Sequence, residues 1–218
     1  MLNLNFRKYC FLLILLGTSW SQTAEVLQQE KAFSLLENIG QRSFQVTFRY
    51  TIQSPQGELE ETFEKGQITI QNKNSKYRLT LPEQEVISDG QTVWTYLKEA
   101  NEVQIADHAP EQGATTPWTI LTNYQQDYVV SGLRTQQMDD QICDVIDLMA
   151  KNEENFLQKI TLTIEQTTKH IKRLETLDDN QTLHIFSIID FAYNPKLDKA
   201  FFKFNATEHS GVEIIDMR

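Results

Sequence analysis

Apolar and polar residues alternate along most of this chain. After Gly40, the side chains of Phe44, Val46, Phe48 and Tyr50 alternate with polar neighbours. A period of two predicts a β-strand that buries one face. Comparable segments follow at short intervals, separated by turn-forming residues. We therefore predict strands at residues 44–52, 58–63, 67–71, 77–81, 86–88, 92–97, 103–106, 128–133, 142–149, 160–164, 171–177 and 182–193.

Two segments have the pattern of helices. Residues 23–39 begin at a threonine suited to an N-cap and end before Gly40. We expect the apolar side of this helix to carry Val26, Phe33, Leu36 and Ile39. A shorter helix is predicted at residues 117–122, with proline in its first turn. The chain is therefore predicted to be mainly β, a curved antiparallel sheet that wraps like a barrel with helices over its mouth or inside it.

The first residues have the features of an export signal. Two basic residues precede a short apolar segment at 11–16, and small residues stand at positions 19 and 21. The apolar segment is shorter than the roughly 20 residues that a membrane-spanning helix needs. We expect residues 1–21 to be removed as a signal peptide and residues 22–218 to form one domain in an exported, periplasmic protein.

Charge and cysteine content narrow the class of protein. The formal net charge is −10, and the predicted signal contributes only basic residues, so residues 22–218 are still more acidic. This balance argues against a nucleic-acid partner and against unassisted docking to anionic membranes. Cys143 is the single cysteine after the predicted signal, so no disulfide forms within the domain. We interpret it as a small buried side chain.

Candidate catalytic and metal-binding patterns are scarce. The chain contains no nucleotide-binding, zinc-protease or nucleophile-elbow motif. Its four histidines are widely spaced, unlike a pair of metal ligands. We therefore predict a protein that is not an enzyme, with no catalytic residue, no cofactor and no metal. An exported hydrolase with an unfamiliar site stays open as a minor alternative.

The alternating strands carry many aromatic and branched side chains. Such residues fill the core of any β domain, or they line an apolar cavity of the size that small barrels and curved sheets use to hold one lipid. Alternation alone does not decide between a solid core and a cavity.

Residues 88–96, with the sequence Ser-Asp-Gly-Gln-Thr-Val-Trp-Thr-Tyr, resemble a hairpin that is typical of the outer-membrane lipoprotein carrier family, LolA. The order of other segments is similar as well: an N-terminal helix, Gly66 opening a strand, Tyr77-Arg78 before a proline, the 117–122 helix, and a closing segment at 202–216. The resemblance extends over residues 22–218. It implies an unclosed β-barrel with a helical lid, which holds lipoprotein acyl chains in a hydrophobic cavity.

The resemblance also implies partners and a ligand site. A monomeric carrier of this family receives acylated lipoproteins from an inner-membrane lipoprotein-releasing ABC transporter and delivers them to an outer-membrane acceptor. A periplasmic lipid-binding or protein-binding sensor domain of similar fold is the alternative. From the alternation, we expect these residues to line the cavity: Phe48, Tyr50, Leu79, Trp94, Tyr96, Ile105, Trp118, Leu121, Leu162 and Phe186.

One turn departs from the family pattern. Well-studied members of the family carry an Arg-Pro pair after the strand that begins near Gly66, and the arginine holds the lid closed. This chain has Asn72-Lys73-Asn74 at that place. Neither asparagine nor lysine offers the rigid donor fork of arginine, so we do not carry the lid-closing mechanism over.

Overall fold

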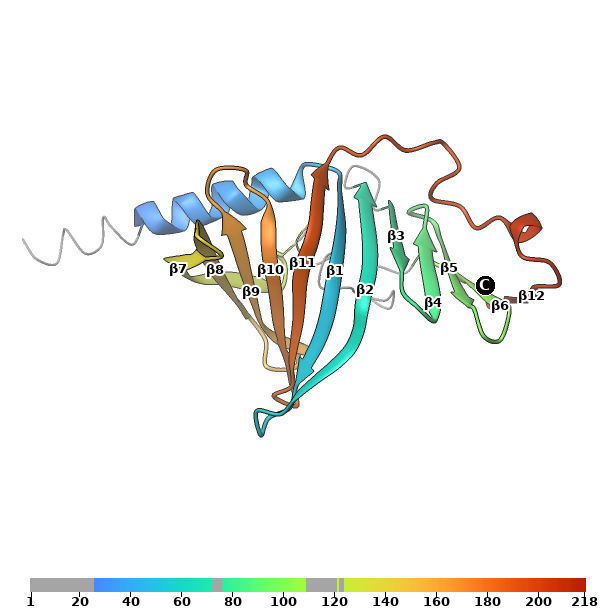
Figure 1. The fold of residues 1–218 in the computed structure, drawn as a ribbon, viewed down its shortest axis with the longest axis horizontal. Helices are drawn as coiled ribbons and strands as arrows, with labels where there is room; N and C mark the ends of the chain where they lie inside the picture. Colours follow the sequence, from blue (N-terminus) through green and yellow to red (C-terminus); the bar gives the residue numbers. More distant parts are fainter. Residues whose placement is uncertain (1–25, 72–75, 109–120, 122–123) are drawn as a thin grey trace, which may run out of the picture.

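The computed structural model describes residues 26–71, 76–108, 121 and 124–218. Within these ranges the fold is one twelve-stranded sheet with a helix at residues 26–40 (Figure 1). The elements are β1 (Phe44–Gln53), β2 (Leu59–Gln71), β3 (Lys76–Thr80), β4 (Gln84–Ser88), β5 (Thr92–Leu97), β6 (Glu102–Asp107), β7 (Tyr128–Met138), β8 (Gln141–Ala150), β9 (Leu157–Glu165), β10 (Ile171–Asp178), β11 (Leu183–Tyr193), the 3-10 helix η2 (Ala206–Glu208) and β12 (Glu213–Asp216).

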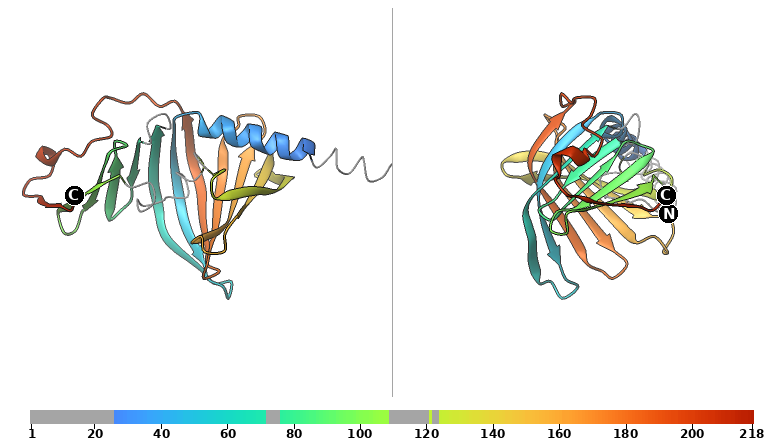
Figure 2. Two further views of the ribbon diagram at one scale, coloured as in Figure 1. Left: turned by 180° about the vertical axis from the view of Figure 1, so that it is seen from behind. Right: turned by 90° about the vertical axis from the view of Figure 1, so that its right-hand side faces the viewer.

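The strand order is β12-β6-β5-β4-β3-β2-β1-β11-β10-β9-β8-β7. Neighbouring strands are antiparallel, except that β12 runs parallel to β6. Within the described part of the chain, β7 and β12 are the two edges and do not pair with each other. The sheet is strongly curved (Figure 2), so the architecture is an unclosed barrel.

Each predicted strand is present, but several are longer than predicted, and β7 extends to Met138 where residues 128–133 were expected. Two further differences concern which strands exist. The segments expected at 58–63 and 67–71 form a single strand, β2, whose register against β1 shifts between Phe48 and Tyr50. A β-bulge within β2 lies where the sequence pattern predicted a break between two strands. Strand β12 was not predicted, because it has four residues and pairs with a strand far away in the sequence.

The helix packs against the concave face of the sheet through one narrow side. Ala32, Leu36 and Ile39 lie on this side and are buried in the main core. Our expectation for the apolar side was wrong at two positions, since Val26 is 53% exposed and Phe33 is 41% exposed. A spacing of three and four residues places one stripe of the helix toward the sheet, and these two side chains lie outside it.

The main core lies between this helix and the concave face. Its largest fully buried members include Phe44 and Phe48 of β1, Ile146 of β8 and Leu162 of β9. The predicted helix at 117–122 and the turn at 72–74 fall outside the described residues, except for Leu121, which is buried in this core.

The chain beyond β11 forms what we call the C-terminal arm, residues 194–212. The arm runs from the end of β11 past β3–β6 to β12 (Figure 1). It packs on the outer face of this part of the sheet, where Phe202 is buried and Phe204 contacts Tyr96 with 5.5 Å between ring centroids. The outer face therefore has a small apolar cluster of its own, separate from the main core.

Candidate ligand-binding face

Strand register brings several of the expected site residues together. Leu162 pairs with Leu174, which pairs with Phe186, which in turn pairs with Tyr50 across four adjacent strands. Direct partners in an antiparallel sheet share one face. The Tyr50 and Phe186 rings are stacked at 4.9 Å, and Phe48 meets Phe186 edge-on at 5.4 Å. An apolar row thus crosses the concave face.

Leu79 and Leu121 belong to the same face. Leu79 pairs with Ile68, which pairs with the fully buried Val46 of β1. Leu121 is 2% exposed within the main core. Six of the ten residues that we expected at the site therefore meet in or against one cluster.

Three expected residues lie on the other side of the sheet. Leu79 pairs with Val86 and Val86 pairs with Thr95, so Trp94 and Tyr96, the neighbours of Thr95, point to the outer face. Ile105 pairs with Trp94 and shares that face. We therefore leave Trp94, Tyr96 and Ile105 out of the candidate face.

The reason for this misplacement is visible in β5. Its two faces both carry apolar side chains, with Val93 on the concave face beside the outward-pointing tryptophan and tyrosine. Alternation separates the two faces but does not tell which of them is concave. Trp118, the tenth expected residue, lies outside the described part of the chain.

Part of the concave face is accessible. Tyr50 and Leu79 are only half-buried and pack against the edge of the core. Further half-buried apolar residues border the core in the same way: Leu81, Val130, Leu133 and Ile188. These side chains provide apolar surface that a hydrophobic ligand can cover.

An open pocket of about 220 Å³ lies where the helix ends. It is lined by Leu36, Gly40, Leu121 and Tyr124, together with three polar side chains. Pockets for drug-sized ligands have volumes of about 300–1,000 Å³. A long acyl chain therefore needs more space than this pocket alone offers.

One ion pair fastens the helix to the sheet. Lys31 of the helix donates to Asp144 Oδ1 of β8 at 2.6 Å, and Gln166 Nε2 donates to the same oxygen at 2.7 Å. Asp144 is 1% exposed, whereas the Lys31 side chain is 47% exposed. The sequence prediction did not include this contact, although a lone aspartate within the apolar segment 142–146 indicates a side chain that needs a partner.

A second polar group interrupts the apolar face near the β10–β11 turn. The Tyr50 hydroxyl lies 2.6 Å from His184 Nδ1, and His184 Nε2 lies 3.2 Å from Asp178 Oδ2. Burial, and then the negative charge of Asp178, raise the pKa of the Tyr50 hydroxyl, which stays protonated. No sequence pattern indicated this chain of contacts, because its members come from three strands.

The described residues contain neither a candidate metal site nor a candidate membrane-spanning helix. Their histidine, cysteine and acidic side chains form no group of three or more that could hold a metal ion. Of the helical segments in those residues, none has both the length and the apolar character that crossing a membrane requires.

Comparisons with known proteins agree on one family. The family described as outer membrane lipoprotein carrier protein LolA matches residues 40–205, which include the candidate face. An outer-membrane lipoprotein carrier protein of Legionella pneumophila (strain Lens) is 26% identical over 137 residues, covering 61% of this chain. The alignment spans 63% of that relative's length.

Several solved structures are similar to this chain. A conserved uncharacterized protein from Thermus thermophilus matches with a TM-score of 0.54 at 11% identity, covering 86% of this chain and 98% of its own. A LolA superfamily protein from Nitrosomonas europaea matches with a TM-score of 0.42 at 16% identity, covering 81% and 98% of the two chains. MucB in complex with MucA(peri) has a TM-score of 0.43 at 14% identity, covering 82% and 60%. The family match over residues 40–205 is decisive, and the chain belongs to the LolA family of outer membrane lipoprotein carrier proteins.

Proposed function

We propose that this protein is a periplasmic carrier that binds the acyl chains of lipoproteins on its concave face and moves them from the inner to the outer membrane. In this proposal residues 1–21 direct export and are then removed. The observation that carries the proposal is the continuous apolar row from Leu162 to Tyr50, with accessible apolar side chains beside it.

Burial of acyl chains supplies the driving force. Each methylene group taken out of water contributes about 0.8 kcal/mol, so even a single chain provides a large favourable free energy. The helix at residues 26–40 offsets part of this gain, because its own apolar stripe must leave the sheet before the ligand can bind. Such a balance keeps the affinity low enough for release to an acceptor.

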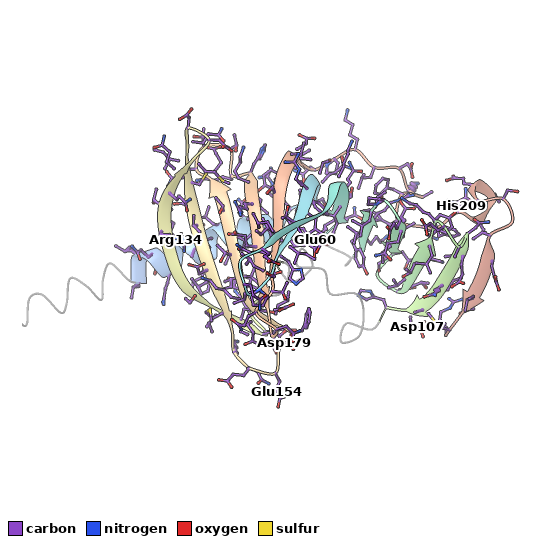
Figure 3. The ribbon with its side chains drawn as sticks, turned by 60° about the horizontal axis from the view of Figure 1, so that its bottom comes forward. Glu60, Asp107, Arg134, Glu154, Asp179 and His209 are labelled. Carbon is purple, nitrogen blue, oxygen red and sulfur yellow. The ribbon has the colours of Figure 1, made fainter. Side chains whose placement is uncertain are left out.

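The charge distribution supports a protein partner at each membrane. Glu154 and Asp179 lie at the end of the sheet where the β8–β9 and β10–β11 turns meet (Figure 3), and both side chains are exposed. Together with a net charge of −10, they disfavour direct contact with anionic lipid. We therefore propose that an inner-membrane transporter loads the carrier and that an outer-membrane acceptor unloads it.

A release assay tests the proposal. Purified protein spanning residues 22–218 is added to energised spheroplasts that synthesise a labelled triacylated lipoprotein. We expect the lipoprotein to enter the soluble fraction in a one-to-one complex. If folded protein releases none, a sensing or protein-binding role is favoured, and co-purification would then recover a protein partner rather than lipid.

The concave face makes a specific contribution to this release. Leu79→Gln places a polar group on half-buried concave surface, and we expect release to fall about tenfold or more because an unpaired amide would contact the acyl chain. Ile105→Gln is the matched control, since Ile105 is half-buried on the outer face. Equal loss of release in both variants would contradict the assignment of the concave face.

A further inference from the structure

Thr176 has an unusual environment on the concave face. Its side chain is 1% exposed, and its hydroxyl oxygen has no hydrogen-bond partner among the residues that the structure describes. Thr176 pairs with Ile160 on one side and with His184 on the other, which places it on the ligand side of the sheet. A buried hydroxyl without a partner is unfavourable, so this position carries a cost that packing alone does not explain.

Polar atoms are held in fixed positions beside this threonine. The Asp178 carboxylate only accepts hydrogen bonds, so the His184 nitrogen that faces it, Nε2, carries a proton. His184 Nδ1 lies 2.6 Å from the Tyr50 hydroxyl. Asp178 is itself fixed, because its Oδ1 accepts from the backbone N–H groups of Asn180 and Thr182. The polar group is therefore rigid, whereas the rest of the row is apolar.

We propose that Thr176, next to His184, forms a polar subsite that binds the amide group of an acylated ligand. The inference rests on the proposed carrier function and adds a ligand class to it. A hydroxyl both donates and accepts, which matches an amide with its N–H and C=O groups. A carboxylate is disfavoured at this place by the nearby Asp178 charge and by the apolar neighbours Ile160 and Leu174.

The subsite acts only in the loaded protein. Thr176 is covered in this structure, so a ligand reaches its hydroxyl after the acyl chain has displaced the side chains above it. The hydrogen bond then replaces an unsatisfied hydroxyl with a satisfied one. The subsite therefore selects among ligands with equal hydrocarbon length and contributes little to the binding of a plain hydrocarbon.

Three matched fluorescent probes test this selectivity: 1-dodecylpyrene, pyrenedodecanoic acid and the N-methylamide of that acid. Their dissociation constants are measured for the wild type and for Thr176→Val, which removes the hydroxyl and keeps the shape. We expect Thr176→Val to weaken binding of the amide about three- to tenfold and to change binding of the hydrocarbon and the acid less than about twofold. The unfolding midpoint of the variant stays equal or rises, because an unpaired buried hydroxyl has been removed.

Thr163→Val is the matched control. Thr163 is a buried threonine on the neighbouring strand β9, but it pairs with Val145 and Arg173 on the outer face. We expect it to leave the affinity for all three probes unchanged. Equal weakening of the three probes by Thr176→Val, or no change in the amide affinity, would overturn the subsite while leaving the carrier function intact. A wild type that binds none of the probes would overturn the carrier function and the subsite together.

Discussion

Glu165 organises the turn between β9 and β10. Its carboxylate accepts hydrogen bonds from the backbone N–H groups of Thr167 and Thr168, each at 2.6 Å, and from the Thr168 hydroxyl. The Thr168 hydroxyl bond and the two backbone bonds lower the pKa of Glu165 from 4.5 to about 2. These donors favour the ionised carboxylate, whose two oxygens both accept strongly, so the stability of the turn depends on the charge of a single side chain.

This turn predicts a change of stability with pH. A carboxyl group whose pKa is lower in the folded than in the unfolded protein stabilises the fold above its unfolded pKa, and it loses this effect as the pH falls toward its folded pKa. We expect Glu165→Gln to lower the urea midpoint at pH 7, and the difference from the wild type to shrink between pH 4.5 and about 2. Glu153→Gln, at an exposed position of the β8–β9 loop, is the control. A difference that stays constant with pH would exclude ionisation as the cause.

Single positions also show what the sequence could and could not predict about the site. Phe48 and Tyr50 were placed correctly on one face because β1 alternates cleanly between apolar and polar side chains. In β5 the same reasoning failed, because Val93 and Trp94 are both apolar and only the register with neighbouring strands separates them. The Lys31–Asp144 contact joins residues 113 positions apart, which no local pattern predicts.

At the scale of elements, the Lys31–Asp144 ion pair determines how the helix is held. Lysine is half-exposed and can return to water, whereas the aspartate is buried. We therefore expect Lys31→Met to destabilise the protein more than Asp144→Asn does, because it leaves a buried carboxylate without its cation. It should cost about 1–3 kcal/mol, less than for a fully buried pair.

Hydrogen exchange of residues 26–40 and urea denaturation measure this effect. The double variant Lys31→Met with Asp144→Asn should recover part of the loss, since the uncompensated charge is gone. If Lys31→Met and the double variant lowered the free energy of unfolding equally, the charge of Asp144 would not matter for docking of the helix.

Arg78 links the C-terminal arm to β3 and β4. Arg78 of β3 donates to both Glu85 carboxylate oxygens, at 2.8 and 2.9 Å, and to the backbone oxygen of Phe201 in the arm at 3.1 Å. Its guanidinium also lies 5.3 Å from the centre of the Phe201 ring. Lysine has no such fork, so it cannot maintain all these contacts at once.

We expect Arg78→Lys to loosen the arm. The arm contains Lys196, Lys199 and Lys203 as tryptic sites, and their cleavage should accelerate severalfold while the sheet remains intact by circular dichroism. Arg134→Lys is the control, because Arg134 pairs with Asp147 on β8, far from the arm. Unchanged cleavage would show that Phe202 and Phe204 hold the arm without help from Arg78.

For the molecule as a whole, the periodicity of the sequence was enough to predict a curved, mainly β sheet, since most strands alternate over five or more residues. It was not enough to predict the arm, whose short elements depend on contacts with distant strands. The arm covers the outer face of β3–β6, and the helix covers part of the concave face. The two faces thus carry separate apolar clusters. In the proposed function, ligand and helix compete for the concave one.

This competition predicts how fast the carrier loads. Leu36 is 1% exposed at the centre of the contact between helix and sheet. We expect Leu36→Ala to lower the free energy of unfolding by about 2–4 kcal/mol and to speed the association of an acyl probe, because the helix leaves the sheet more readily. Stopped-flow fluorescence measures the association rate. Phe33→Ala, on the exposed side of the same helix, should change neither quantity. An association rate that stays constant in Leu36→Ala, although the helix exchanges its amide hydrogens faster, would show that the ligand enters without displacing the helix.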